Sequence, residues 1–195
     1  NSPEPFNARS GLDDTFNYDT ANYVAFQPET RITVRGSAQA NTNELRIYSD
    51  GGLLPDGNQV FTWQGATADF NGSYTGVTPA EGSMSFHMSC PSWSGWGVFM
   101  TANYDMRKYT NGYLSFWFRN ASHAQGFTVE VEGPQGTKRS YSVGSSYALN
   151  QWHKITIPAS TFSGVNFATM YGLFEFTATD YNDVCVDDVR WSLTP

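Results

Sequence analysis

The sequence predicts an all-β fold, a β-sandwich of the jelly-roll type with about ten short antiparallel strands. Apolar and polar residues alternate with a period of two in several short segments, as they do in half-buried strands. Clusters of Gly, Asn, Asp, Ser and Pro separate these segments and predict turns. Aromatic residues make up 16% of the 195 residues, and such side chains favour strands over helices.

The first 43 residues are polar and irregular, and we expect them to form an N-terminal arm or linker. Two short apolar segments within it, 23–26 and 31–35, can pair as a small hairpin. Residues 44–195 carry the regular alternation and are predicted to form the β-sandwich domain.

The strands expected in the first half of this domain are each bounded by a turn signal. The sequence Ser49-Asp50-Gly51-Gly52 ends the first strand, and a Pro-Ser-Trp-Ser-Gly loop follows the third. The third segment alternates strictly, which favours a strand with one buried face. The expected strands here are 45–48, 60–63, 84–90 and 96–101.

The second half repeats the pattern with longer apolar alternation. In 113–119 the apolar side chains are Leu114, Phe116 and Phe118, every second residue. A single helical turn near 160–162 is the one helical feature that we expect. The strands expected here are 113–119, 127–132, 140–143, 152–157, 171–177 and 184–193.

Alternation assigns one face of these strands to the core. The predicted core residues are Met84, Phe86, Met88, Leu114, Phe116, Phe118, Phe127, Val129, Val131, Ile155, Ile157, Phe174 and Phe176. The opposite face carries Ser85, His87, Ser89, Tyr113, Ser115, Trp117, Arg119, Thr128, Glu130, Glu132, Glu175 and Thr177. Aromatic, carboxylate and guanidinium groups on one face suit sugar binding, because a sugar offers an apolar C–H face and pairs of hydroxyls. The alternative is a solvated face with cross-strand ion pairs.

Tryptophans in Ser- and Gly-rich turns add further candidates, because such turns offer little to bury an indole. Trp93 stands in the loop after the third strand, where ligand contact and local packing are equal alternatives. Trp96 opens a strand, which favours a structural role. The candidate ligand-binding residues are Trp63, Trp93, Trp96, Trp117, Arg119, Glu130, Glu175 and His87.

Two carboxylates, Asp187 and Asp188, interrupt the apolar run of the last strand. Buried carboxylates are costly unless a cation satisfies them. If the first and last strands are neighbours, Asp50 joins the pair, and a structural calcium ion suits such an oxygen set. The alternative is that these aspartates face water.

The chain has two cysteines, Cys90 and Cys185, and no Cys/His spacing typical of zinc. We expect them to form a disulfide, which presumes a secreted protein. The alternative is two buried thiols.

The formal net charge is −7, from 11 basic and 18 acidic residues, which argues against nucleic acid or an anionic membrane as partner. No run of 18 apolar residues occurs, so no membrane span is expected. The N-terminus reads as a mature one without a visible signal peptide.

Catalysis is a second possibility that the residues raise. Glu130 and Glu132 are two positions apart on one strand, so their side chains are about 7 Å apart, a separation compatible with inverting glycoside hydrolysis. A small jelly-roll hydrolase or lyase that uses these carboxylates is therefore the alternative to a binding domain. A structural or adhesive sandwich that binds protein is the third hypothesis.

Residues 44–193 resemble the galactose-binding-like jelly-roll modules that are appended to secreted bacterial glycoside hydrolases. The segments that carry the resemblance are 44–50 (ELRIYSD), 61–63 (FTW), 81–86 (EGSMSF), 95–99 (GWGVF), 113–118 (YLSFWF), 152–158 (WHKITIP) and 186–191 (VDDVRW). The resemblance implies a non-catalytic carbohydrate-binding module with a structural calcium ion held by Asp50 and Asp187. It also implies a module of a larger, secreted enzyme. We expect the module to be a monomer that binds a polysaccharide, a neutral β-glucan.

Overall fold

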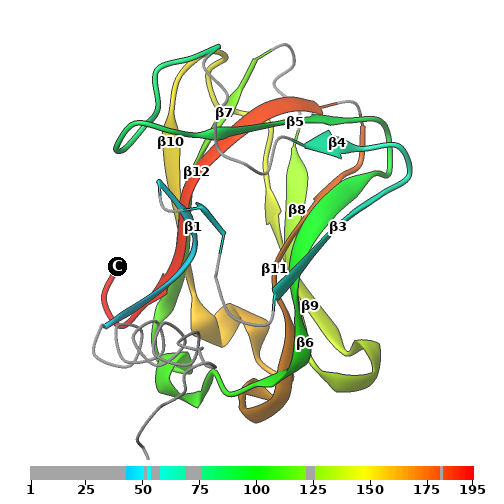
Figure 1. Ribbon diagram of the computed structural model, residues 1–195, viewed down its shortest axis with the longest axis vertical. Coiled ribbons are helices and arrows are strands. Elements are labelled where there is room, and N and C mark those ends of the chain that lie inside the picture. The colour runs from blue at the N-terminus through cyan, green and yellow to red at the C-terminus, as the bar shows by residue number, and fades with distance from the viewer. Residues whose placement is uncertain (1–42, 51, 54–57, 69–75, 122–125, 181) are drawn as a thin grey trace, which may run out of the picture. The chain divides into compact units, whose positions relative to one another are not determined.

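The computed structural model of the chain describes residues 43–50, 52–53, 58–68, 76–121, 126–180 and 182–195. Two antiparallel sheets face each other as a sandwich (Figure 1), which confirms the predicted jelly-roll fold. The predicted arm over residues 1–43, with its hairpin, lies outside the described residues except for Asn43. Among the described residues, no helix has the length and apolar character needed to cross a membrane.

The first sheet, called sheet I, is built around the C-terminal strand β12. Its main path runs β10-β7-β12-β1-β2, while β5 pairs with the first half of β12 and β4 pairs with β5. The strands are β1 (Glu44–Ser49), β2 (Gly52–Leu53), β4 (Thr67–Ala68), β5 (Phe86–Cys90), β7 (Tyr113–Asn120), β10 (His153–Pro158) and β12 (Asn182–Ser192).

The second sheet, called sheet II, has the strand order β3-β6-β11-β8-β9. Its strands are β3 (Asn58–Trp63), β6 (Gly95–Tyr104), β8 (Phe127–Glu132), β9 (Lys138–Val143) and β11 (Met170–Ala178). Short 3-10 turns connect the strands at η1 (Arg107–Tyr109), η2 (Pro134–Gly136), η3 (Ala159–Phe162) and η4 (Phe167–Thr169). The η3 turn is the helical turn expected near residues 160–162.

The core lies between the two sheets and contains the residues that alternation predicted. All of them are buried except Met84, which precedes β5 and is half-buried. Trp96 also lies in this core, with its ring 4.6 Å from that of Phe86 and 5.6 Å from that of Phe174. Trp96 is fully buried, so the prediction that it contacts a ligand is wrong.

The predicted disulfide is also wrong, because both cysteines are buried free thiols. Cys90 pairs with Asn182 and faces the core, whereas Cys185 pairs with His87 and Arg119 on the outer face of sheet I. Side chains on opposite faces of one sheet cannot form a disulfide bond. Burial raises the pKa of each thiol to about 11.

Candidate functional site

The outer face of sheet II presents three rows of side chains that cross all five strands. Directly opposed residues of antiparallel strands share a face, so the register defines each row. In the strand order β3, β6, β11, β8, β9, the rows are Trp63–Gly95–Thr177–Thr128–Ser142, Phe61–Gly97–Glu175–Glu130–Ser140 and Gln59–Phe99–Gly172–Glu132–Lys138. Aromatic residues therefore lie at the β3 and β6 side, and charged residues at the β8 and β9 side.

Three glycines form the floor of this face and let large side chains lie close to the sheet. A Cβ atom at Gly95 would lie 2.7 Å from Cζ2 of Trp63, so the indole covers this glycine. A Cβ atom at Gly97 would lie 2.7 Å from the Phe99 ring, and one at Gly172 would lie 3.3 Å from it. The absent side chains thus make room for two aromatic rings, those of Trp63 and Phe99.

A line of three rings extends along one end of the face. The Phe61 and Phe99 rings are 5.6 Å apart, and the Phe99 and Tyr171 rings are 5.3 Å apart. Tyr171 lies beside Phe99 because β11 changes register on both sides of Gly172. Phe61 is 47% exposed and Tyr171 36%, whereas Phe99 between them is 7% exposed. Such a surface can stack against the apolar C–H face of a sugar ring.

The polar half is organised around a buried carboxylate. Glu175 has no exposed surface, and its Oε1 accepts a 2.6 Å hydrogen bond from Lys138 Nζ, which also lies 3.3 Å from Glu130 Oε1. The other oxygen of Glu175 faces Glu132 and lies against Gly172 without a hydrogen bond of good geometry. Burial raises the pKa of Glu175 to about 7, although Lys138 opposes the shift.

We expect this carboxylate to make stability depend on pH. In the unfolded chain Glu175 loses its proton near its ordinary pKa of 4.5, but in the folded protein only near 7. The folded state then binds more protons between these values, so the free energy of unfolding falls as pH rises from about 4.5 to 7. Urea unfolding at several pH values should show a fall of roughly 1–3 kcal/mol relative to Glu175→Gln. Parallel pH profiles for the two proteins would contradict this assignment.

The structure separates the sequence-predicted candidates into different regions. The residues on the outer face of sheet II are Trp63, Glu130 and Glu175. The residues on the outer face of sheet I are His87, Trp117 and Arg119. Trp93 lies in the loop between β5 and β6, where it is 66% exposed and has a positive φ of 61°.

Four residues of the sheet II face escaped the sequence analysis: Phe61, Phe99, Lys138 and Tyr171. The alternation of Gly95, Gly97 and Phe99 against the buried Trp96 and Val98 was the signal that could have identified the glycine floor. No such alternation surrounds Lys138, which lies in a mostly polar segment, so the sequence offered no reason to choose it.

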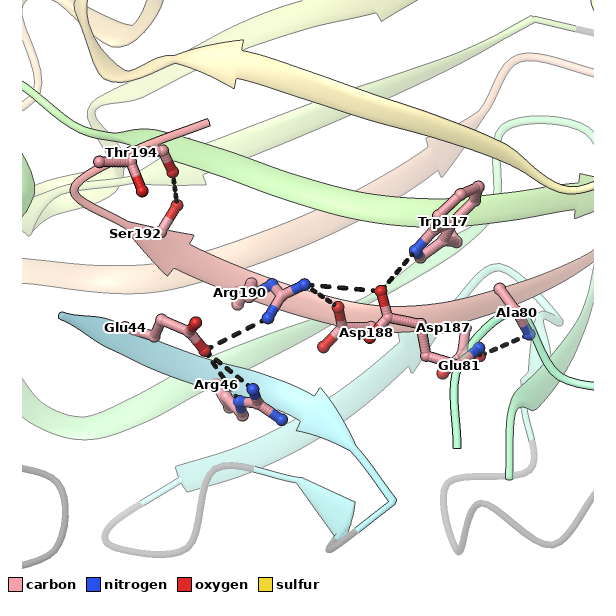
Figure 2. Close-up of polar contacts among 10 residues, drawn as sticks. All are labelled: Glu44, Arg46, Ala80, Glu81, Trp117, Asp187, Asp188, Arg190, Ser192 and Thr194. Atoms are coloured by element: carbon pink, nitrogen blue, oxygen red, sulfur yellow. Dashed lines mark hydrogen bonds and ion pairs between the residues drawn. The ribbon is translucent and has the colours of Figure 1, made fainter. Parts of the chain in front are cut away.

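The outer face of sheet I is partly occupied by the segment 76–84. Asp187 Oδ2 accepts hydrogen bonds from the backbone N–H groups of Ala80, at 2.9 Å, and Glu81, at 3.0 Å (Figure 2). The Trp117 indole donates to Glu81 Oε2 at 3.2 Å. This tryptophan is therefore engaged with the segment that lies against it.

The predicted calcium ligands line one pocket of about 230 Å³, together with Glu81, Gly82, Ser49 and Arg46. Arg190 Nη2 lies 2.6 Å from Asp188 Oδ2 and 3.6 Å from Glu81 Oε2, and its Nη1 lies 3.3 Å from Glu44 Oε1 (Figure 2). Asp50 accepts hydrogen bonds from the N–H groups of Ser83 and Met84. Burial raises the pKa of Asp187 to about 6.

The oxygen donors in this pocket are of the type that calcium prefers. In the part of the chain that the structure describes, however, no group of three or more acidic, histidine or cysteine side chains is placed to hold a metal ion. The arginine supplies the positive charge beside Asp188 in this arrangement. The calcium ion therefore stays a prediction.

Comparison with known proteins adds a family. Residues 12–192 match the sequence model of a family described as Carbohydrate binding domain 30, and the match begins within the predicted arm. No curated protein matches the chain.

Several solved structures share the fold. The family 30 carbohydrate-binding module of the cellulosomal cellulase Cel9D-Cel44B of Clostridium thermocellum has a TM-score of 0.55 and 14% identity, over 76% of this chain and 96% of that one. A family 11 module from Clostridium thermocellum, in complex with a β-1,3-1,4-mixed-linked tetrasaccharide, has a TM-score of 0.53 and 16% identity, over 77% and 96%. The exo-1,3/1,4-β-glucanase ExoP of a Pseudoalteromonas species has a TM-score of 0.59 and 14% identity, over 79% of this chain and 21% of that one.

Proposed function

The chain belongs to the family Carbohydrate binding domain 30, and from this premise we propose that it binds a neutral β-glucan on the outer face of sheet II without acting on it chemically. The observation that carries the proposal is the group of aromatic side chains Trp63, Phe61, Phe99 and Tyr171 over the glycine floor, in which the Phe99 ring is tilted by 54° against Phe61 and by 44° against Tyr171. Trp93, which is 66% exposed in the loop that leads into Gly95, is a further aromatic candidate near the end of β6 that pairs with Trp63.

Charge supports a neutral ligand. The three rows contain three carboxylates, Glu130, Glu132 and Glu175, and one ammonium group, Lys138. An acidic polysaccharide would be repelled by the excess of negative charge, whereas hydroxyl groups can both donate to carboxylates and accept from the ammonium.

The β-glucan and the parent enzyme are proposed from the structural relatives. One of them is in complex with a mixed-linked β-glucan fragment, and another is a domain within a β-glucanase. We therefore infer that this module holds a glycoside hydrolase near its polysaccharide outside the cell.

The arrangement of the carboxylates gives less support to catalysis. In the predicted pair of Glu130 and Glu132, the Glu130 side chain is only 19% exposed and its Oε1 lies 3.3 Å from Lys138 Nζ, so this carboxylate is held by an ion pair. A hydrolase needs two carboxyl groups that both reach the substrate. Release of reducing ends that is lost in Glu130→Gln would favour the enzyme instead.

Affinity electrophoresis of the protein in gels that contain soluble polysaccharides tests the proposal. We expect retardation by mixed-linked β-1,3-1,4-glucan and other neutral β-glucans, and none by polygalacturonate. Retardation by no glycan would overturn the proposal and favour a sandwich that binds protein.

We keep a structural calcium ion as a separate proposal, held by Asp50, Asp187 and Asp188 after Arg190 releases Asp188. The proposal is supported by the oxygen donors in the pocket, which is lined by the carboxylates of Asp50, Glu81, Asp187 and Asp188. Chelation with EDTA should then lower the melting temperature by several degrees, and added calcium should restore it. An identical melting temperature in EDTA and in calcium would refute the proposed ion in this pocket.

A further inference from the structure

Stacking against a sugar involves only the aromatic residues of the sheet II face and leaves the charged residues on β8, β9 and β11 without an assigned function. We propose that Lys138, held in place by Glu175 and Glu130, is a specificity-determining residue of the glycan face. It donates a hydrogen bond to one of two adjacent hydroxyls of a neutral sugar, while Glu132 accepts from the other. This inference rests on the proposed function and identifies a pair of adjacent sugar hydroxyls as the part of the ligand that these residues recognise.

The register places these groups beside the aromatic surface. Phe99, Gly172, Glu132 and Lys138 follow one another in one row, on four neighbouring strands. Neighbouring strands are about 4.8 Å apart, and Glu132 lies on β8, next to β11. The hydroxyl groups at the edge of a sugar ring that stacks near Tyr171 on β11 are therefore about this distance from Glu132. The flexible side chain of Lys138 reaches the next hydroxyl from the edge strand β9.

The ammonium group is oriented before a ligand arrives. A lysine side chain is flexible, and fixing it on binding normally weakens affinity. Here the carboxylates of Glu175, at 2.6 Å, and Glu130, at 3.3 Å, hold Nζ, yet the side chain remains 43% exposed. An ammonium group has three N–H donors, and two carboxylates can take two of them. The third donor is available to a ligand.

Glu175 is a positioning residue, because it is fully buried and cannot touch the sugar. Among the described residues, the titratable groups that face it are Lys138 from β9 and Glu130 and Glu132 from β8, while Gly97 of β6 lies opposite it. Burial raises the pKa of Glu175 to about 7, so its hold on Lys138 weakens when the pH falls below neutrality. Glycan affinity should therefore decrease several-fold from pH 8 to pH 5, and this decrease should be absent in Glu175→Gln.

Titration calorimetry with two soluble glucans separates hydroxyl recognition from stacking. The probes are mixed-linked β-1,3-1,4-glucan and hydroxyethylcellulose, in which many hydroxyls are substituted. Lys138→Met should weaken binding of the β-1,3-1,4-glucan about tenfold and change binding of hydroxyethylcellulose little. The matched control is Lys154→Met, an exposed lysine on the outer face of sheet I, which should leave both affinities unchanged.

A second variant allows for misfolding, because Lys138→Met leaves the buried carboxylate of Glu175 without its cation. Lys138→Met combined with Glu175→Gln removes both charges and should show the same tenfold loss with a melting temperature near that of the parent. Binding that requires Trp63 but is unaffected in both Lys138 variants would overturn this inference alone. Absence of glycan binding by the parent protein would overturn the proposed function and this inference together.

Discussion

Trp63→Ala is expected to weaken binding of mixed-linked β-1,3-1,4-glucan about 30-fold. The indole lies against Gly95 at the edge of the aromatic surface and is partly exposed, so it can contact a sugar ring. Removing an aromatic side chain of this size from a binding surface costs about 2 kcal/mol, which corresponds to roughly this change in affinity. Affinity electrophoresis and titration calorimetry measure it directly.

Trp117→Ala is the informative comparison, because Trp117 lies on the outer face of the other sheet and hydrogen-bonds Glu81. We expect a change in glycan affinity of less than twofold and a lower melting temperature. If Trp117→Ala abolishes binding and Trp63→Ala does not, the ligand binds sheet I and the proposed site is wrong.

Gly95→Ala should have the largest effect on stability, because the added methyl group has no space. A Cβ atom at this position would lie 2.0 Å from the carbonyl oxygen of Phe176 and 2.7 Å from the Trp63 ring. Strands β6 and β11 would have to separate locally, at a cost of roughly 3 kcal/mol. Urea unfolding should show this loss, and glycan binding should fall with it because the indole is displaced.

The matched control for this substitution is Gly144→Ala. A Cβ atom at Gly144 would meet no other atom within 4 Å, so its free energy of unfolding should change by less than about 0.5 kcal/mol. Equal stability of the two variants would show that β6 and β11 can adjust without cost.

The core and the strands were predictable because burial on one side of a strand imposes a period of two on the sequence. Phe116, Val129 and Phe174 are examples, fully buried as expected. The turn after the first strand was predictable from local chemistry alone, since Asp and Gly disfavour continued strand.

The site was only partly predictable, because alternation assigns a residue to a face but not to a sheet. Glu175 and Trp117 both alternate with core residues, yet they lie on opposite outer surfaces of the sandwich. Which sheet a strand joins depends on pairings between residues distant in sequence. The cysteine pair was misjudged for the same reason, since only the register of β5 with β12 shows that Cys90 and Cys185 point to opposite sides.

The partners of strand β12 have a consequence for the order in which the chain folds. Glu44 in β1 pairs with Ser192 in β12, which is 192 − 44 = 148 positions later. During synthesis β1 therefore has no main pairing partner until about 150 further residues have left the ribosome. Contacts between such distant residues slow folding, because a long loop must close first. We expect a slowly folding domain, in which β5, β7 and β1 are joined only when β12 arrives.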